Sequence, residues 1–266
     1  MLDINAEIIT LGRELLIGKT VNTNASWIAS QLTALGITVT RINVAGDTVG
    51  EISSTIAESL GRRPSILITT GGLGPTYDDL TIDGLAAALN APKEINKEAM
   101  RLVQAKYRAM KLKMTPSRYK LAMMPVGVHP LVNECGSAPG VFVEYRGTMI
   151  FSLPGVPREM KVMFTSQVLK VILQRIPSQT FRERSFVIEG MPESSLAPII
   201  DGWVPSNRRV YLKSHPGGTE SAPTITIHIS AAGSNATELD DALLRAEESF
   251  SSLVMRGGGK VRRQES

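Results

Sequence analysis

Apolar residues in the first ninety positions follow two alternating spacings. Three short, mostly apolar runs have the length and composition of strands, at residues 6–11, 37–44 and 65–70. Each is followed by a segment with apolar residues three or four positions apart, which predicts helices at about 24–35, 49–60 and 82–89. This alternation predicts a parallel sheet with helices on both faces, which is a three-layer α/β domain.

The middle of the chain continues with a helical, increasingly basic stretch at 93–120. Glycine- and proline-rich turns then separate two strand-like runs, at 140–145 and 148–153. A long helix is predicted from Pro157 to about residue 176, where a proline stops it.

A second pattern begins after Pro177. Strand-like and helical segments follow in the order β-α-β-β-α, which predicts a smaller α+β domain. We therefore assign residues 1–176 to the first domain and 177–256 to the second. Residues 257–266 are polar and glycine-rich, so we expect a mobile tail there.

Composition narrows the class of protein. Hydrophobic residues make up 42% of the 266 positions, which is enough for a buried core. The sequence has no apolar run long enough to span a membrane and no basic N-terminal stretch typical of a signal peptide. The single cysteine excludes an internal disulfide. We therefore expect a cytoplasmic protein without a membrane partner. The three histidines do not have the spacing of a zinc protease, and a net charge of +4 gives little reason to expect nucleic acid as a partner.

A glycine-rich loop follows the apolar run at 65–70. In TTGGLGPTYDDLTID, a strand leads through Gly71, Gly72 and Gly74 into a helix. Glycines let backbone N–H groups approach a ligand, and a helix N-terminus favours phosphate, so Thr70, Thr76 and these glycines are candidate phosphate ligands. The alternative to a phosphate-binding loop is a tight strand-to-helix turn with a purely structural role.

Carboxylates are expected at the same edge of the sheet. Asp78 and Asp79 follow the glycine loop, while Glu14 and Asp47 follow the first two strands. Each could be a helix cap. Together they favour a divalent cation such as Mg²⁺, which would bridge them to phosphate, or a role in activating water.

Four segments, taken in order, resemble one known family. TTGGLGPTYDDLT resembles the molybdopterin-binding fold of MogA, MoaB and MoeA, with Asp79 and Asp47 at the motif aspartates. LGRELLIGKTVNTNASWIA, NECGSAPG and LPGVPREM are similar to segments of the CinA (competence/damage-inducible) family. One departure is Leu121, where that family tends to have glutamine.

The resemblance implies an activity and a set of site residues. It implies a metal-dependent ADP-ribose pyrophosphatase, with catalytic Asp47, Asp78 and Asp79 and metal ligands Asp78, Glu14 and Glu159. The substrate-binding residues it implies are Thr70, Gly71, Gly72, Gly74, Thr76, Asn22, Asn24, Ser137 and Gly140. We expect a side chain at Gly72 to obstruct the ligand more than it harms the fold.

The resemblance also concerns the second domain, which is similar to the KH-type domain of CinA. We expect this domain to close over the α/β domain and to present Lys213 to the diphosphate. We also expect the protein to be a homodimer. Because the chain stops before the nicotinamide mononucleotide deamidase domain of longer relatives, we expect no deamidation, and a deamidase could be a separate partner chain. The alternative function is a molybdopterin-, pterin- or nucleotide-binding module without hydrolase activity.

Overall fold

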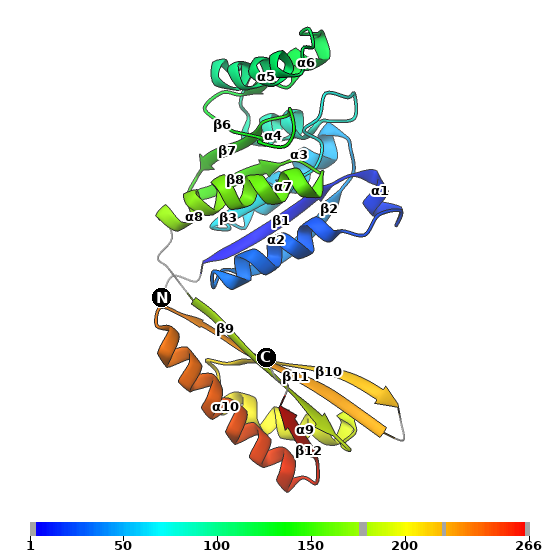
Figure 1. The fold of residues 1–266 in the computed structure, drawn as a ribbon, viewed down its shortest axis with the longest axis vertical. Coiled ribbons are helices and arrows are strands. Elements are labelled where there is room, and N and C mark those ends of the chain that lie inside the picture. Colours follow the sequence, from blue (N-terminus) through cyan, green and yellow to red (C-terminus); the bar gives the residue numbers. More distant parts are fainter. Residues whose placement is uncertain (1–3, 176–179, 220–221, 264–266) are drawn as a thin grey trace. The chain divides into compact units, whose positions relative to one another are not determined.

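The computed structural model describes residues 4–175, 180–219 and 222–263 (Figure 1). The chain separates into two compact units, which divide after residue 177, except that residues 34–36 group with the second unit. Each unit has its own hydrophobic core. No helix in the described ranges is both long and apolar enough to cross a membrane.

The first unit contains a six-stranded sheet in the order β2-β1-β3-β8-β7-β6. Its strands are β1 (Asn5–Leu11), β2 (Thr38–Ala45), β3 (Ile66–Thr70), β6 (His129–Leu131), β7 (Gly140–Tyr145) and β8 (Thr148–Leu153). The four strands β2, β1, β3 and β8 are parallel, whereas β7 and β6 run antiparallel to their neighbours.

The predicted parallel sheet is therefore confirmed for β2, β1, β3 and β8 but does not extend to β7 and β6, so the sheet as a whole is mixed. The reason lies in the connection between β7 and β8, which consists of Arg146 and Gly147 alone. Both residues have positive φ, 49° and 86°. A two-residue turn of this kind joins antiparallel strands, because a parallel pair needs a crossover of a dozen residues or more.

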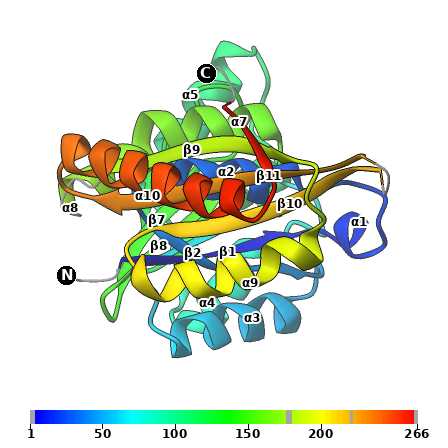
Figure 2. The same cartoon turned by 90° about the horizontal axis from the view of Figure 1, so that it is seen from below.

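Helices cover both faces of this sheet, as the sequence predicts (Figure 2). On one face, Ile52 and Ile56 of α3 (Val49–Gly61) and Leu85 of α4 (Thr81–Leu89) join the core formed with Ile9 of β1. On the other face, Trp27 of α2 (Thr23–Ala34) contacts Phe164 edge to face, with ring centroids 5.4 Å apart. The helices of the layers are α2 (Thr23–Ala34), α3 (Val49–Gly61), α4 (Thr81–Leu89), α7 (Pro157–Met163) and α8 (Leu169–Arg175), with short α1 (Arg13–Leu16) after β1. A π-helical turn at Phe164–Val168 separates α7 from α8.

An excursion between α4 and β6 forms a separate small layer. It contains β4 (Lys93–Ile95), α5 (Lys97–Ala109), α6 (Pro116–Lys120) and β5 (Met123–Pro125), and β4 pairs with β5 antiparallel. The sequence predicts only a helical stretch here. The side chains of Val103, Tyr107 and Leu121 pack against Leu73 of the glycine loop.

The second unit has a four-stranded antiparallel sheet with two helices. Its elements are β9 (Thr180–Glu189), α9 (Glu193–Trp203), a 3₁₀ turn (Val204–Ser206), β10 (Tyr211–Thr219), β11 (Ala222–Gly233), α10 (Ala236–Arg256) and β12 (Lys260–Arg263). The strand order is β10-β11-β9-β12. The resulting β-α-β-β-α-β unit has the element order of ferredoxin-like domains, and the KH-type identity stays a prediction.

The predicted mobile tail is wrong where the structure describes it. Residues 260–263 form β12, which pairs with β9 from Lys260 opposite Glu189 to Arg263 opposite Phe186. Glu247 of α10 is buried and accepts hydrogen bonds from Arg263 (2.8 Å) and from Arg184 of β9 (2.5 Å). This shared carboxylate attaches β12 to the rest of the unit.

We expect a chain ended after residue 175 to fold on its own. The core clusters that the described residues of the first unit form contain no residue from beyond 175, so truncation removes no contact within these clusters. A cooperative thermal transition followed by circular dichroism would show this. An unfolded or molten truncated chain would mean that the first unit depends on the second.

Candidate functional site

The glycine loop turns sharply at the end of β3. Gly71 and Gly72 have positive φ, 112° and 61°. A Cβ atom on Gly71 would lie 2.4 Å from the carbonyl oxygen of Leu11, and one on Gly72 would lie 2.4 Å from Oγ1 of Thr81. Both glycines are therefore required by the backbone conformation and by close packing, as expected if the loop is a tight structural turn.

The same loop leaves backbone donors unused. Thr81 closes it, since its Oγ1 donates to Gly71 O (2.7 Å) and its N–H donates to Gly72 O (3.1 Å). Among the N–H groups of the loop and of the first turn of α4 that have no acceptor within the described residues are those of Gly72, Leu73, Gly74, Ile82 and Asp83. All five residues line one pocket. Unpaired N–H groups at a helix N-terminus are suited to an anion.

Asp78 and Asp79 both lie close to Thr76, which precedes them in the loop. Asp79 Oδ2 accepts from Thr76 N at 2.9 Å, and the Thr76 hydroxyl lies within hydrogen-bonding distance of both carboxylates. This hydroxyl holds the pKa of Asp78 below its usual value, with smaller help from the backbone N–H of Asp78 and the charge of Lys120. Lys120 Nζ donates to Thr76 O (2.5 Å) and Asp79 O (2.9 Å), so the lysine ammonium group is held beside the two aspartates.

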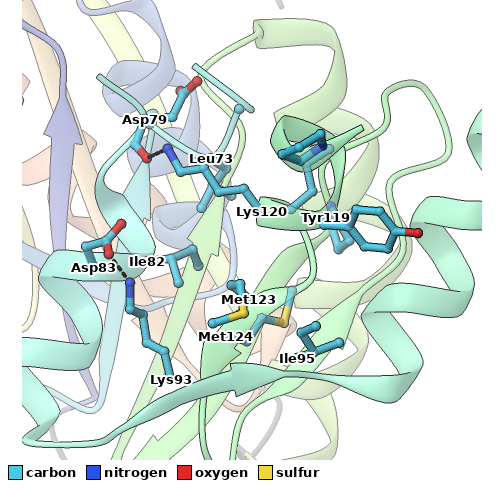
Figure 3. A pocket seen from close by; sticks show the side chains of 15 residues that line it. Leu73, Asp79, Ile82, Asp83, Lys93, Ile95, Tyr119, Lys120, Met123 and Met124 are labelled. Atoms are coloured by element: carbon cyan, nitrogen blue, oxygen red, sulfur yellow. Dashed lines mark hydrogen bonds and ion pairs between the residues drawn. The ribbon is translucent and has the colours of Figure 1, made fainter. Parts of the chain in front are cut away.

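The pocket beneath this loop has a volume of about 390 Å³. Figure 3 shows its walls, with Asp79 and Lys120 together and the ion pair of Asp83 and Lys93 at a separate point. Apolar side chains form much of the lining: Leu73, Ile82, Ile95, Leu121, Met123 and Met124. Leu121, where the resemblance leads us to expect glutamine, lines the pocket and contributes an apolar side chain to its wall.

A second, smaller hollow of about 120 Å³ lies at the ends of β1 and β3. Asn22, Asn24, Glu14 and Thr70 all line it, so the structure brings these four predicted residues together. Asn24 Nδ2 donates to Thr70 Oγ1 (3.2 Å) and to the carbonyl oxygen of Gly155 (2.8 Å). Its Oδ1 is buried without a partner among the described residues.

The other predicted residues lie elsewhere. Asp47 Oδ2 accepts from Arg13 N at 2.9 Å, which fixes the start of α1, as a cap would. Ser137 lines a third hollow of about 360 Å³, and its hydroxyl accepts a hydrogen bond from Tyr107 (3.1 Å). Gly140 is buried where a Cβ would lie 2.4 Å from Met163 Sδ, so packing accounts for it. Lys213 is exposed on β10 of the second unit.

The expected metal ligands do not form a cluster. The described ranges hold no group of three or more histidine, cysteine or acidic side chains able to bind a metal ion. Glu159 accepts instead from Asn133 Nδ2 at 2.7 Å. Mg²⁺ is often held by one or two carboxylates together with substrate phosphates and water, and the pair of Asp78 and Asp79 fits that kind of site.

Comparison with known proteins gives the family. The model described as "Probable molybdopterin binding domain" matches residues 7–174, which is most of the chain. The chain belongs to this family. The matched range corresponds to the six-stranded unit with the glycine loop, so the three hollows described above all lie in the molybdopterin-binding domain.

The sequence similarity to other proteins covers both units of this chain. A protein of Sulfurisphaera tokodaii is 42% identical over 257 residues, covering 96% of this chain and 97% of its own length. One of Pyrobaculum aerophilum is 42% identical over 250 residues, covering 94% of each chain. A solved structure of CinA from Thermoplasma acidophilum, a protein described as of unknown function, is 36% identical with a TM-score of 0.60, covering 64% of this chain and 98% of that one.

Sequence reasoning missed most of the large pocket of the molybdopterin-binding domain. Its walls come from α4, β4, α6 and β5, which are separated along the chain and meet only because β4 pairs with β5. Ile82 has the helical spacing of a core residue, and Met123 and Met124 belong to a short apolar run. The basic character of residues 101–120 was the one available signal for Lys120.

Proposed function

We propose that the molybdopterin-binding domain binds a phosphorylated ring compound, either a nucleotide or a pterin. The ring occupies the apolar part of the 390 Å³ pocket, and the phosphate lies against the glycine loop. The observation that carries this proposal is the set of five unpaired N–H groups on residues that line the same pocket. The volume is within the usual range for small-ligand sites.

Hydrolysis of an ADP-ribose-like diphosphate is the activity we propose for this site. Asp79 lines the pocket and Asp78 is the preceding residue, and the hydrogen bond from the Thr76 hydroxyl lowers the pKa of Asp78, which favours its ionised form. Ionised carboxylates at this position can hold a divalent cation that arrives with the diphosphate, and the cation would neutralise phosphate charge. The Lys120 ammonium adds positive charge at the same edge.

Binding without hydrolysis is the second candidate, and one observation favours it. The Thr76 hydroxyl contacts both carboxylates, and the Thr76 N–H donates to Asp79. These hydrogen bonds hold the loop in its conformation, which accounts for Asp78 and Asp79 without a catalytic role. The deciding experiment is to incubate the protein with ADP-ribose, with and without Mg²⁺, and to measure AMP by chromatography. Calorimetric titration with ADP-ribose and with a pterin would be run in parallel. Pterin binding without AMP release supports the binding module, and no binding of either compound contradicts both candidates.

Asp79→Asn is expected to lower metal-dependent AMP release by about 100-fold, the effect of removing a catalytic acid–base group. The amide can still accept from Thr76 N through its oxygen, so the thermal transition should change little. Glu94→Gln is the matched control, because Glu94 is exposed and lies outside the pocket lining. Unchanged AMP release in Asp79→Asn would remove this carboxylate from the reaction.

A further inference from the structure

Asn133, just after β6, holds the loop that follows it at several points. Its side chain is buried, with 5% of its surface exposed. The Oδ1 atom accepts from the N–H groups of Cys135 (3.2 Å) and Gly136 (2.7 Å). The Nδ2 atom donates to the carbonyl oxygen of Ala138 (2.9 Å) and to Glu159 Oε2 (2.7 Å). Two accepted and two donated bonds use the full capacity of the amide.

The direction of the bond to Glu159 follows from this arrangement. A carbonyl oxygen can only accept, so the Asn133 atom that faces Ala138 O must be the NH₂ group. Glu159 Oε2 therefore acts as an acceptor, and this role does not require its negative charge. Glu159 belongs to α7, so the bond joins α7 to the loop of residues 134–138.

Gly136 fits directly against this pair. A Cβ atom there would lie 2.2 Å from Glu159 Oε2 and 2.7 Å from Asn133 Nδ2. The loop therefore packs closely against the carboxylate at Gly136, which leaves no room for a side chain between them.

The loop matters because of what it carries. Ser137 lines the 360 Å³ hollow, and Pro139 lines both that hollow and the 390 Å³ pocket. The segment that Asn133 holds therefore leads directly into the wall shared by the two cavities.

We propose that Asn133 and Glu159 are a positioning pair that fixes this shared wall, and that ligand affinity in the large pocket depends on their hydrogen bond. Glu159 acts as a hydrogen-bond acceptor and not as a metal ligand. The statement about affinity rests on the proposed function, whereas the statement about the loop does not.

Amide hydrogen exchange tests the loop without any ligand. Glu159→Ala removes the acceptor, so exchange of the Cys135 and Gly136 amides should become about tenfold faster, as expected when a buried donor, here Asn133 Nδ2, loses a partner. Glu159→Gln keeps an acceptor oxygen and should retain the protection of the parent chain. Glu134→Gln, which removes an equal charge from the same loop, is the control and should have no effect.

A charge exchange tests the direct contact. Asn133→Asp places a carboxylate against Glu159 and should loosen the loop, because two acceptors then face each other. Adding Glu159→Gln supplies an NH₂ donor, so the double variant should regain part of the lost protection. A double variant no better protected than Asn133→Asp would contradict the direct bond.

Titration of the same variants with ADP-ribose tests the wall. We expect weaker binding in Glu159→Ala and parent-like binding in Glu159→Gln at every Mg²⁺ concentration. If Glu159→Gln exchanges as fast as Glu159→Ala, the charge matters and the positioning role is wrong. Faster exchange with unchanged affinity would overturn the link to the pocket. If the parent chain does not bind ADP-ribose, the proposed function fails, and the exchange data alone still decide whether the pair holds the loop.

Discussion

Arg62→Met is expected to lower the free energy of unfolding by about 3 kcal/mol at neutral pH. Glu7 lies on the central strand β1 with 2% of its side chain exposed, and it accepts from Arg62 Nε and Nη2, both at 2.7 Å. Removing the guanidinium leaves a buried carboxylate for which Ser59 (2.8 Å) is the one remaining side-chain donor among the described residues. We choose the lower end of the range for breaking a buried pair, because Arg62 is itself 35% exposed.

The pH dependence of this loss has a definite sign. Burial alone would raise the pKa of Glu7, but hydrogen bonds from Arg62 and Ser59 and the charge of Arg62 outweigh it and hold the pKa below 4.5. A carboxyl group whose pKa is lower in the folded state stabilises the fold above its unfolded pKa, and this contribution disappears as the pH falls through the folded value. The difference between the parent chain and Arg62→Met should therefore shrink as the pH falls through the acidic range in which glutamate carboxyl groups become protonated.

Urea unfolding at a series of pH values measures this effect. Arg63→Met is the matched control, because Arg63 is the exposed neighbour and has no ion pair among the described residues. Equal stability of the two variants at pH 7, or a difference that does not change with pH, would show that the pairing of Glu7 contributes little.

Gly72→Val is expected to destabilise the first unit by about 3 kcal/mol or more. A β-branched residue is strained at φ 61°, at a cost of about 1–2 kcal/mol. Its Cβ would also lie 2.4 Å from Oγ1 of Thr81, a buried residue whose hydroxyl is fixed to Gly71 O. Overpacking of this kind adds about 1–3 kcal/mol. The sequence-based expectation, that a side chain here obstructs the ligand more than it harms the fold, is therefore replaced by a loss of stability.

Gly18→Val separates the two causes. Gly18 has a similar φ of 71°, but a Cβ there would meet nothing within 4 Å. It should show only the cost of backbone strain, so the difference in unfolding free energy between the two variants measures the clash with Thr81. If the two variants are equally stable, the loop moves away from Thr81 without cost.

The sequence predicts the strands and helices of the sheet closely, because their apolar residues have clear periods. The runs at 140–145 and 148–153 coincide with β7 and β8. Their direction was not predicted, since it depends on the turn at Arg146 and Gly147 and not on periodicity. β12 was missed because one apolar residue, Val261, stands among basic ones, and its pairing with β9 depends on residues seventy positions away.

The sequence predicts that the site residues form one cluster, whereas the structure places them in several separate locations. Carboxyl ends of parallel strands do share an edge, which is why Asn22, Asn24 and Thr70 meet. Spacing along the chain does not show that Glu159 is bonded to Asn133. The large pocket depends on how the segment of β4 and β5 packs against the rest of the first unit. The spacing of apolar residues within that segment does not predict this packing.

The exposed thiol of Cys135 makes this protein convenient for spectroscopy. It is the one cysteine of the sequence, and it lies on the loop beside the wall common to two cavities. A maleimide dye would therefore attach at a single position without prior mutagenesis. Its emission would sense small movements of that wall, so the filling of either cavity could be followed in real time with unlabelled compounds.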